Sequence, residues 1–152
     1  MRTARIPDPR VCSIDEAMRI LGEKWAMVAM RELTFGVHRF DEIVFNTGAP
    51  RDIVAARLRS LEEAGLLDKR AYTERPVRYE YVLSQAGLEL FNVLHTIRDW
   101  GDRHVRDDPE NVTKFFHDDH EFRPELTCAV CGKIVQRDSV TSGRDLHRSE
   151  IA

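Results

Sequence analysis

The sequence has few cysteines and no long apolar segment. Three cysteines occur in 152 residues, an odd number that builds no disulfide framework and fits a reducing compartment. The longest uninterrupted apolar run, Trp25 to Met30, is far shorter than a membrane span, and the start of the chain lacks the apolar core of a signal peptide. We therefore expect a cytoplasmic protein without a membrane partner.

Motifs of common enzyme classes are also missing. The chain contains no Gly-rich phosphate loop, no G-x-S-x-G and no H-E-x-x-H, so we expect no enzymatic activity. Its 42% apolar and 32% charged residues are typical of a folded domain with a solvated surface. The net charge is -3, but acidic residues are concentrated between positions 102 and 126. The rest of the chain is close to neutral, so total charge does not exclude nucleic acid as a partner.

Helical patterns fill the first part of the chain. Ser13 followed by Glu16 predicts a capping box at the start of a first helix. A second helix, from Lys24 to Leu33, is apolar nearly all round, and a short helix from about Arg39 to Phe45 follows. The residues expected at the centre of the core are Trp25, Val28, Ala29 and Leu33.

A turn and a further helix complete a helix-turn-helix. Asn46 to Ala49 is predicted to form the turn, and Pro50 suits the first position of the helix because its missing N–H costs nothing there. On a helical wheel, Val54, Leu58 and Leu61 fall on one side. We expect this side to lie in the core and the opposite side to face another molecule.

The outward side of this helix is small and basic, which allows close approach to a partner. We expect it to contact DNA through Arg51, Asp52, Ala55, Ala56 and Arg59. Arg57 is different, because the wheel places it within the apolar stripe, where an unpaired guanidinium would be costly. We expect it to pair with an acidic residue, and the candidates are Glu32, Asp41 and Glu42.

Two strand-like segments, residues 66–72 and 79–83, follow the stop at Gly65. They predict a hairpin whose basic residues are Lys69, Arg70, Arg75 and Arg78, arranged with Tyr72 and Tyr79. A helix-turn-helix followed by a basic hairpin is typical of a winged helix that binds double-stranded DNA. Arg75 and Arg78 at the tip are expected to contact the backbone or the minor groove.

A last long helix begins after Ser84, which is expected to cap it. Its apolar stripe at helical spacing could be a core face, but a domain this small favours packing of the stripe against a second copy. We therefore expect a homodimer, with help from the first helix. The predicted dimerisation residues are Ile14, Met18, Leu90, Val93, Leu94, Ile97 and Trp100.

Beyond residue 107 the composition changes, and a C-x-x-C-G-K motif contains Cys128 and Cys131. This spacing is typical of a zinc knuckle, and a structural zinc would need two further ligands, with His117 and His120 as candidates. His147 could take one of these places. A metal-free hairpin and a redox pair are the alternatives.

Several segments occur together in order: "LGEKW" (21–25), "RELTFGVHRFDEI" (31–43), "RLRSLEEAGLL" (57–67), "RPVRYEYVLSQAG" (75–87) and "DWGDRH" (99–104). As a set they resemble the HxlR-type transcriptional regulators, which are MarR-like winged helix-turn-helix proteins of bacteria. The resemblance implies a mainly α fold with a small β-hairpin wing, dimerised through the N- and C-terminal helices. It also implies a two-fold DNA operator, a DNA-binding and dimerisation domain over residues 10–106, and an extension over residues 107–152.

The resemblance bears on Cys12 as well. Some members of the family use a cysteine at the matching position as a thiol switch, and a helix N-terminus favours the reactive thiolate. The alternative is an unreactive, half-buried cysteine. Neither the operator sequence nor a small-molecule effector follows from the residues. The alternative function is a winged helix or zinc-ribbon adaptor that binds proteins, which would need an apolar outward face on the second helix of the motif.

Overall fold

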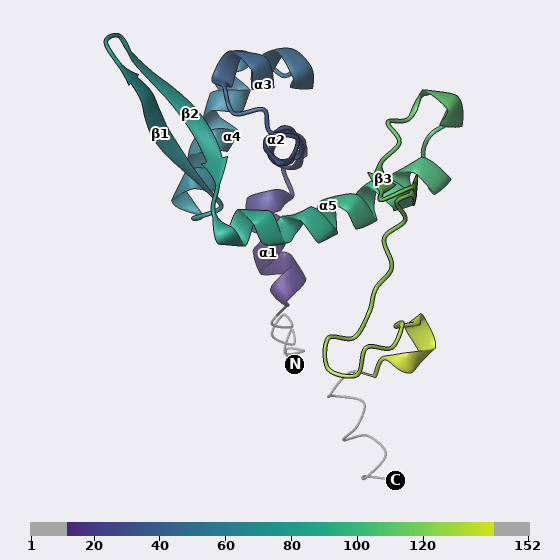
Figure 1. Cartoon of the computed structure of the whole chain (residues 1–152). Coiled ribbons are helices and arrows are strands. Elements are labelled where there is room, and N and C mark those ends of the chain that lie inside the picture. Colours follow the sequence, from purple (N-terminus) through teal and green to yellow (C-terminus); the bar gives the residue numbers. More distant parts are fainter. Residues whose placement is uncertain (1–11, 142–152) are drawn as a thin grey trace, which may run out of the picture. The chain divides into compact units, whose positions relative to one another are not determined.

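The computed structural model describes residues 12–141 and is mainly helical (Figure 1). The elements are α1 (Ser13–Leu21), α2 (Lys24–Thr34), α3 (Phe40–Thr47), α4 (Arg51–Glu63), β1 (Leu67–Glu74), β2 (Val77–Leu83), α5 (Gln85–His104), η1 (Pro109–Asn111), β3 (Phe116–His117), β4 (His120–Glu121) and η2 (Arg137–Ser139). Helices α1 to α5 with the β1–β2 hairpin confirm the predicted fold class.

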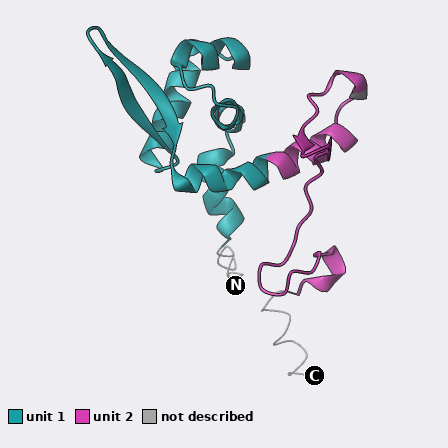
Figure 2. Cartoon of the chain, in the orientation of Figure 1, with its two compact units in different colours: residues 1–94 teal, residues 95–152 magenta. Residues whose placement is uncertain are grey.

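The chain divides into two compact units, residues 1–94 and residues 95–152 (Figure 2). The first contains α1 to α4 and the β1–β2 hairpin, and the boundary falls within α5. The predicted domains, residues 10–106 and 107–152, stay a prediction. No helix in residues 12–141 is long and apolar enough to cross a membrane.

The predicted capping box at Ser13 is wrong. Cys12 is the N-cap residue of α1 and makes no side-chain capping bond; its carbonyl oxygen accepts a hydrogen bond from the Glu16 N–H at 3.2 Å. The cap therefore lies one residue earlier than the Ser13-to-Glu16 spacing indicates. Helix α1 ends at Gly22, whose N–H donates to the Met18 carbonyl oxygen at 2.8 Å.

The core of the first unit forms where α2, α3 and α4 meet. Its largest fully buried side chains are Met30, Ile43, Val54, Leu58, Leu61 and Leu67. The predicted inner face of α4 is confirmed, because all three of its apolar residues are among them. Trp25 and Val28 are only half-buried, contrary to expectation, whereas Ala29 and Leu33 are buried as expected. In place of Trp25 and Val28, the small Ala26 and the flexible Met30 of α2 are buried in the core.

The turn of the helix-turn-helix is shorter than predicted. Helix α3 continues to Thr47, whose hydroxyl donates to the Ile43 carbonyl oxygen at 2.7 Å. Gly48 ends it in the left-handed conformation, at φ 67°, which glycine adopts without a steric penalty. Pro50 is the N-cap of α4 rather than its first residue, with an extended ψ of 139°.

Two buried or half-buried charged groups join the helices of this motif. Glu32 is 4% exposed, and its carboxylate accepts hydrogen bonds from Arg31 Nη2 at 2.6 Å and Asn46 Nδ2 at 2.9 Å. Arg57 pairs with Glu23 at 3.2 Å, so all three predicted partners were wrong. Helix α4 packs against α2, which brings Arg57 to the residue just before α2. This contact joins residues far apart in the chain.

The β1–β2 hairpin is longer than predicted, because its strands extend to Glu74 and Val77. Its antiparallel register pairs Leu67 with Leu83 and is interrupted by a bulge between Ala71 and Thr73. The hairpin projects away from the helices (Figure 1). At its base, the segment before α3 pairs with β2: the Tyr81 N–H donates to the His38 carbonyl oxygen at 2.9 Å. This pairing ties the hairpin to the start of α3.

The described part of the second unit contains an aromatic cluster around His95. The imidazole is buried and lies edge-on to the rings of Phe115 and Phe122, at centroid distances of 4.9 and 5.3 Å. The Arg98 guanidinium stacks over Phe115 at 4.5 Å and donates to the Phe122 carbonyl oxygen at 3.3 Å. Burial lowers the pKa of His95, and the Arg98 charge lowers it further.

The N-terminal end of α5 is anchored as predicted and offers a test of the packing. Ser84 Oγ accepts the Gly87 N–H at 3.2 Å and donates to the Gly65 carbonyl oxygen at 2.6 Å. A Cβ atom on Gly87 would lie 2.1 Å from the Leu66 carbonyl oxygen, whereas nothing lies within 4 Å of a Cβ atom on Gly101.

We therefore expect Gly87→Ala to lower the free energy of unfolding by about 1–3 kcal/mol through backbone displacement. Gly101→Ala is the matched control on the same helix, and alanine there should be neutral or stabilising by about 1 kcal/mol at most. Urea unfolding at equal protein concentration measures both. Equal midpoints for Gly87→Ala and the parent would contradict the close approach of α5 to Leu66.

Candidate nucleic-acid interface

Helix α4 presents the predicted outward face to solvent. Asp52, Ala56 and Arg59 are exposed and Ala55 is half-buried, on the side opposite to the buried leucines. Small side chains at the middle of this face leave the helix backbone accessible to a large partner. A helix of 13 residues with such a face can enter the major groove of B-DNA.

The cations near α4 differ in how far they are neutralised. Arg51, at the start of the helix, pairs with Asp41 of α3 at 2.7 Å and also lies over the Phe40 ring. Within residues 12–141, no carboxylate lies within ion-pair distance of Arg59. Arg59 therefore carries an uncompensated charge on the outward face.

Arg59 also lies near the base of the hairpin. Burial raises the pKa of Tyr81 in β2, the Glu62 carboxylate raises it further, and the Arg59 guanidinium acts in the opposite direction. Helix α4 packs against β1, which pairs with β2, so α4 and the hairpin lie side by side in the first unit.

The hairpin carries exposed cations and aromatic rings. Arg75 and Arg78 are exposed at its tip, and in the described part of the chain no carboxylate pairs with either. Lys69 lies over the Tyr79 ring at 4.4 Å, and Arg70 pairs with Asp68 at 3.2 Å. Unpaired charge is therefore concentrated at the tip, while the base is partly neutralised.

Arg39 belongs to this surface, although the sequence did not single it out. It is exposed, is the N-cap residue of α3, and lies over the Tyr72 ring of β1 at 5.2 Å. Its backbone forms an isolated antiparallel bridge with Glu80 of β2. The sequence offered only one sign of this role, a basic residue at the start of a helix. The contact of Arg39 with the hairpin depends on the pairing of two segments far apart in the chain.

The predicted dimerisation residues separate into two groups. Leu90 and Leu94 are half-buried and pack against the core of the first unit. Ile14 and Met18 on α1 and Val93 on α5 are exposed, with Ile14 at 71% and Val93 at 41%. In the second unit, Ile97 and Trp100 are exposed as well. Exposed apolar side chains remain on both helices.

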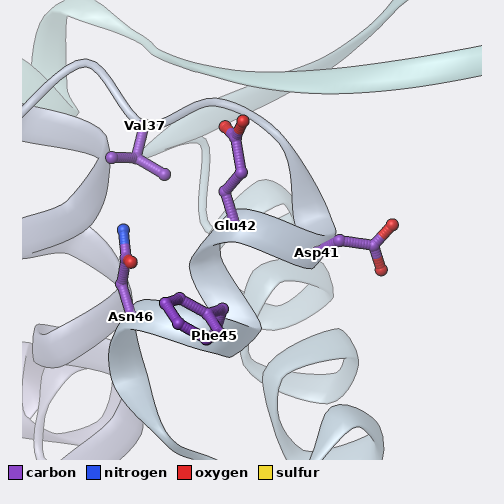
Figure 3. A pocket seen from close by; sticks show the side chains of 5 residues that line it. All are labelled: Val37, Asp41, Glu42, Phe45 and Asn46. Atoms are coloured by element: carbon purple, nitrogen blue, oxygen red, sulfur yellow. The ribbon is translucent and has the colours of Figure 1, made fainter.

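A hollow of about 470 Å³ lies beside α3 and is lined by Val37, Asp41, Glu42, Phe45 and Asn46 (Figure 3). Phe45 is 86% exposed. In Figure 3, Asp41 points away from the Phe45 ring, and this carboxylate is the partner of Arg51. The hollow thus borders the ion pair at the start of α4.

The thiols and imidazoles singled out in the sequence lie in separate places. Cys12 is exposed and free. Cys128 and Cys131 lie 3.7 Å apart, while the rings of His117 and His120 lie 5.5 Å apart in the β3–β4 hairpin. Within residues 12–141, no three His, Cys, Asp or Glu side chains form a group that could hold a metal ion. His147 lies outside the described residues.

Comparison with known proteins gives a consistent result. The model of the HxlR-like helix-turn-helix family matches residues 20–109. Rv3095 of Mycobacterium tuberculosis, named an uncharacterized HTH-type transcriptional regulator, is 36% identical over 131 residues, which cover 85% of this chain and 83% of the relative. YtcD of Bacillus subtilis, named in the same way, is 29% identical over 94 residues, covering 61% of this chain and 75% of the relative.

Solved structures agree with this match. PA1607, named a candidate transcription factor, superposes with a TM-score of 0.78 at 27% identity and covers 88% of this chain and 95% of its own. The reduced form of the transcriptional regulator YodB from B. subtilis gives a TM-score of 0.54 at 26% identity, covering 64% of this chain and 97% of its own. These neighbours support the winged-helix architecture built above from the residues.

Proposed function

The chain belongs to the HxlR-like helix-turn-helix family, and from this premise we propose that it is a homodimeric transcriptional regulator that binds a two-fold DNA operator in the cytoplasm. The observation that carries the proposal is the outward face of α4, where Ala55 and Ala56 lie one turn before Arg59 and no carboxylate of the described chain forms an ion pair with Arg59. Such a face fits the major groove, whose base edges offer acceptors to a guanidinium.

The alternative, a winged helix that binds proteins, fits this face less well. Protein interfaces are depleted of charged residues at their centre and enriched in apolar ones. The exposed residues of α4 include Asp52, Ala56 and Arg59, without a large apolar side chain among them. The residues that support DNA binding are Arg51, Asp52, Ala55, Ala56, Arg59, Arg75 and Arg78.

A charge placed in the middle of the proposed reading face tests this function. We expect Ala55→Glu to abolish operator binding, because its carboxylate would face phosphates where there is little room. Arg59→Ala should cost about 1–3 kcal/mol at the operator and less on random duplex, if the guanidinium reads a base. Fluorescence anisotropy titration with both duplexes measures the difference.

The matched control is Ala86→Glu, which adds the same charge at an exposed alanine in the first turn of α5. Each variant is first shown to keep the parent melting temperature. If Ala55→Glu binds the operator as tightly as Ala86→Glu does, α4 is not the reading helix and the protein-binding alternative is the better one.

The hairpin tip should contribute affinity without sequence preference. Replacing Arg75 or Arg78 by alanine is expected to weaken binding to all duplexes and to reduce the slope of log K against log salt by about one for each phosphate that is no longer neutralised. Arg70→Ala removes a cation already paired with Asp68 and serves as the control. If the salt-dependence slope were unchanged in both Arg75→Ala and Arg78→Ala, the hairpin tip would not contact DNA.

The dimer in this proposal rests on the exposed apolar residues of α1 and α5. Ile14, Met18 and Val93 would be covered by a second copy, and α5 continues with Ile97 and Trp100. Leu90 and Leu94 would support the same helix from the core side. A two-fold arrangement of two α4 helices matches a two-fold operator.

Val93→Asp tests the dimer without disturbing the core, because Val93 is exposed whereas Leu94 is packed inside. We expect sedimentation at micromolar concentration to give a dimer for the parent and a shift towards monomer for Val93→Asp, with an unchanged circular dichroism spectrum. Asn92→Asp adds the same charge at the neighbouring exposed position and should stay dimeric. A parent that sediments as a stable monomer would refute both the dimer and the two-fold operator.

Two finer parts of the proposal concern the cysteines. Cys12, exposed at the start of α1, stays a candidate thiol switch. A structural zinc at Cys128 and Cys131 would need two further ligands, and His117 and His120 do not join them in the described structure.

A further inference from the structure

The two cysteines of the C-terminal loop are held close together by the backbone around them. Thr127 and Ile134 form an antiparallel bridge, and the Cys128 N–H donates to the Lys133 carbonyl oxygen at 2.9 Å. The Gly132 N–H donates to the Cys128 carbonyl oxygen at 2.8 Å, with Gly132 in the left-handed conformation at φ 71°. This tight turn places Cys128 and Cys131 3.7 Å apart.

The same turn surrounds one of the thiols with hydrogen-bond donors. The backbone N–H groups of Val130 and Cys131 donate to the Cys128 sulfur. The thiolate is the form of a cysteine that attacks disulfides. Cys131 is exposed, so a reagent in solution can reach the pair.

Two neighbouring thiols are suited to exchange with a disulfide. A structural zinc ion is bound by four ligands, usually Cys and His. Within residues 12–141, no third His, Cys, Asp or Glu joins Cys128 and Cys131 in a metal-binding group, and His147 lies outside the described residues.

We propose that Cys128 and Cys131 are a reversible dithiol–disulfide pair that low-molecular-weight disulfides oxidise to a bond within one chain. The site is distinct from the surface proposed to bind DNA and does not depend on that function. Because the two residues are three apart in a closed turn, ring closure competes well with reaction of a second molecule.

The reaction balances in two exchange steps. The Cys128 thiolate attacks one sulfur of glutathione disulfide, forms a mixed disulfide and expels one glutathione thiolate, which takes up the proton that Cys128 released. The Cys131 sulfur, after losing its proton, then attacks Cys128 Sγ, closes the intrachain bond and expels the second glutathione. Two cysteine thiols are oxidised, and one glutathione disulfide is reduced to two glutathione thiols.

Mass spectrometry of the full-length protein tests the proposal. Reduced protein is incubated with glutathione disulfide, quenched with acid, alkylated and digested. We expect a single peptide with an internal Cys128–Cys131 disulfide, which has two hydrogens fewer than the dithiol peptide and escapes alkylation until dithiothreitol restores both thiols. In Cys131→Ser the second step is blocked, so the mixed disulfide on Cys128 should accumulate instead of the intrachain bond.

Two controls separate this pair from other thiol chemistry. Cys12→Ser should form the intrachain disulfide as the parent does. Parent protein unfolded in guanidinium should form it with an equilibrium constant about tenfold lower, because the turn no longer holds the thiols together. Oxidation confined to Cys12 would overturn the proposal. So would equal yields in folded and unfolded protein, or about one zinc per chain bound by Cys128 and Cys131 after purification without chelator.

Discussion

Burial of the inner face of α4 orients the surface that this protein presents to a partner. Leu58 and Leu61 are fully buried, and burying a leucine side chain contributes about 1.5–3 kcal/mol. Since the side chains of a helix keep fixed angular positions, this burial leaves Ala56 and Arg59 on the outside. Leu67 begins β1 in the same core, so the packing that orients the helix also fixes the start of the wing.

Features that depend on local pattern were predictable from the sequence. The 3.6-residue period located the buried side of α4, and Ser84 caps α5 as expected. Features that depend on tertiary contacts were not. Arg57 pairs with Glu23 because α4 packs against α2, and the hydrogen bond between His38 and Tyr81 joins two segments with no pairing signal in the sequence. The starts of α1 and α4 were each misplaced by one residue, with Cys12 and Pro50 as the N-caps, because sequence pattern locates helix ends less precisely than helix faces.

The exposure of the candidate site's residues was predictable from the sequence, but their ion pairs were not. The outward residues of α4 and the hairpin tip lie on the surface as expected, yet Arg51 is already paired with Asp41. In the proposed complex, Arg51 would have to give up this ion pair to neutralise a phosphate, whereas Arg59 and the hairpin tip would not. Arg39, unnoticed in the sequence, adds to them through its position over Tyr72. A chain with net charge -3 can therefore present a cationic surface.

Helix α5 uses different residues for packing in its own chain and for the proposed contact with a second copy. The sequence predicted that the whole apolar stripe of α5 would contact a second copy. Leu90 and Leu94, however, already pack against the core of their own chain. The apolar area that a second copy could bury therefore comes from Val93 and from Ile14 and Met18 of α1. Because these side chains are exposed, replacing them removes little packing from the monomer. Monomer stability and dimer affinity can thus vary independently. In the proposed complex both half-sites of a two-fold operator are occupied together, so weakened association of the two copies would lower operator affinity even with α4 unchanged.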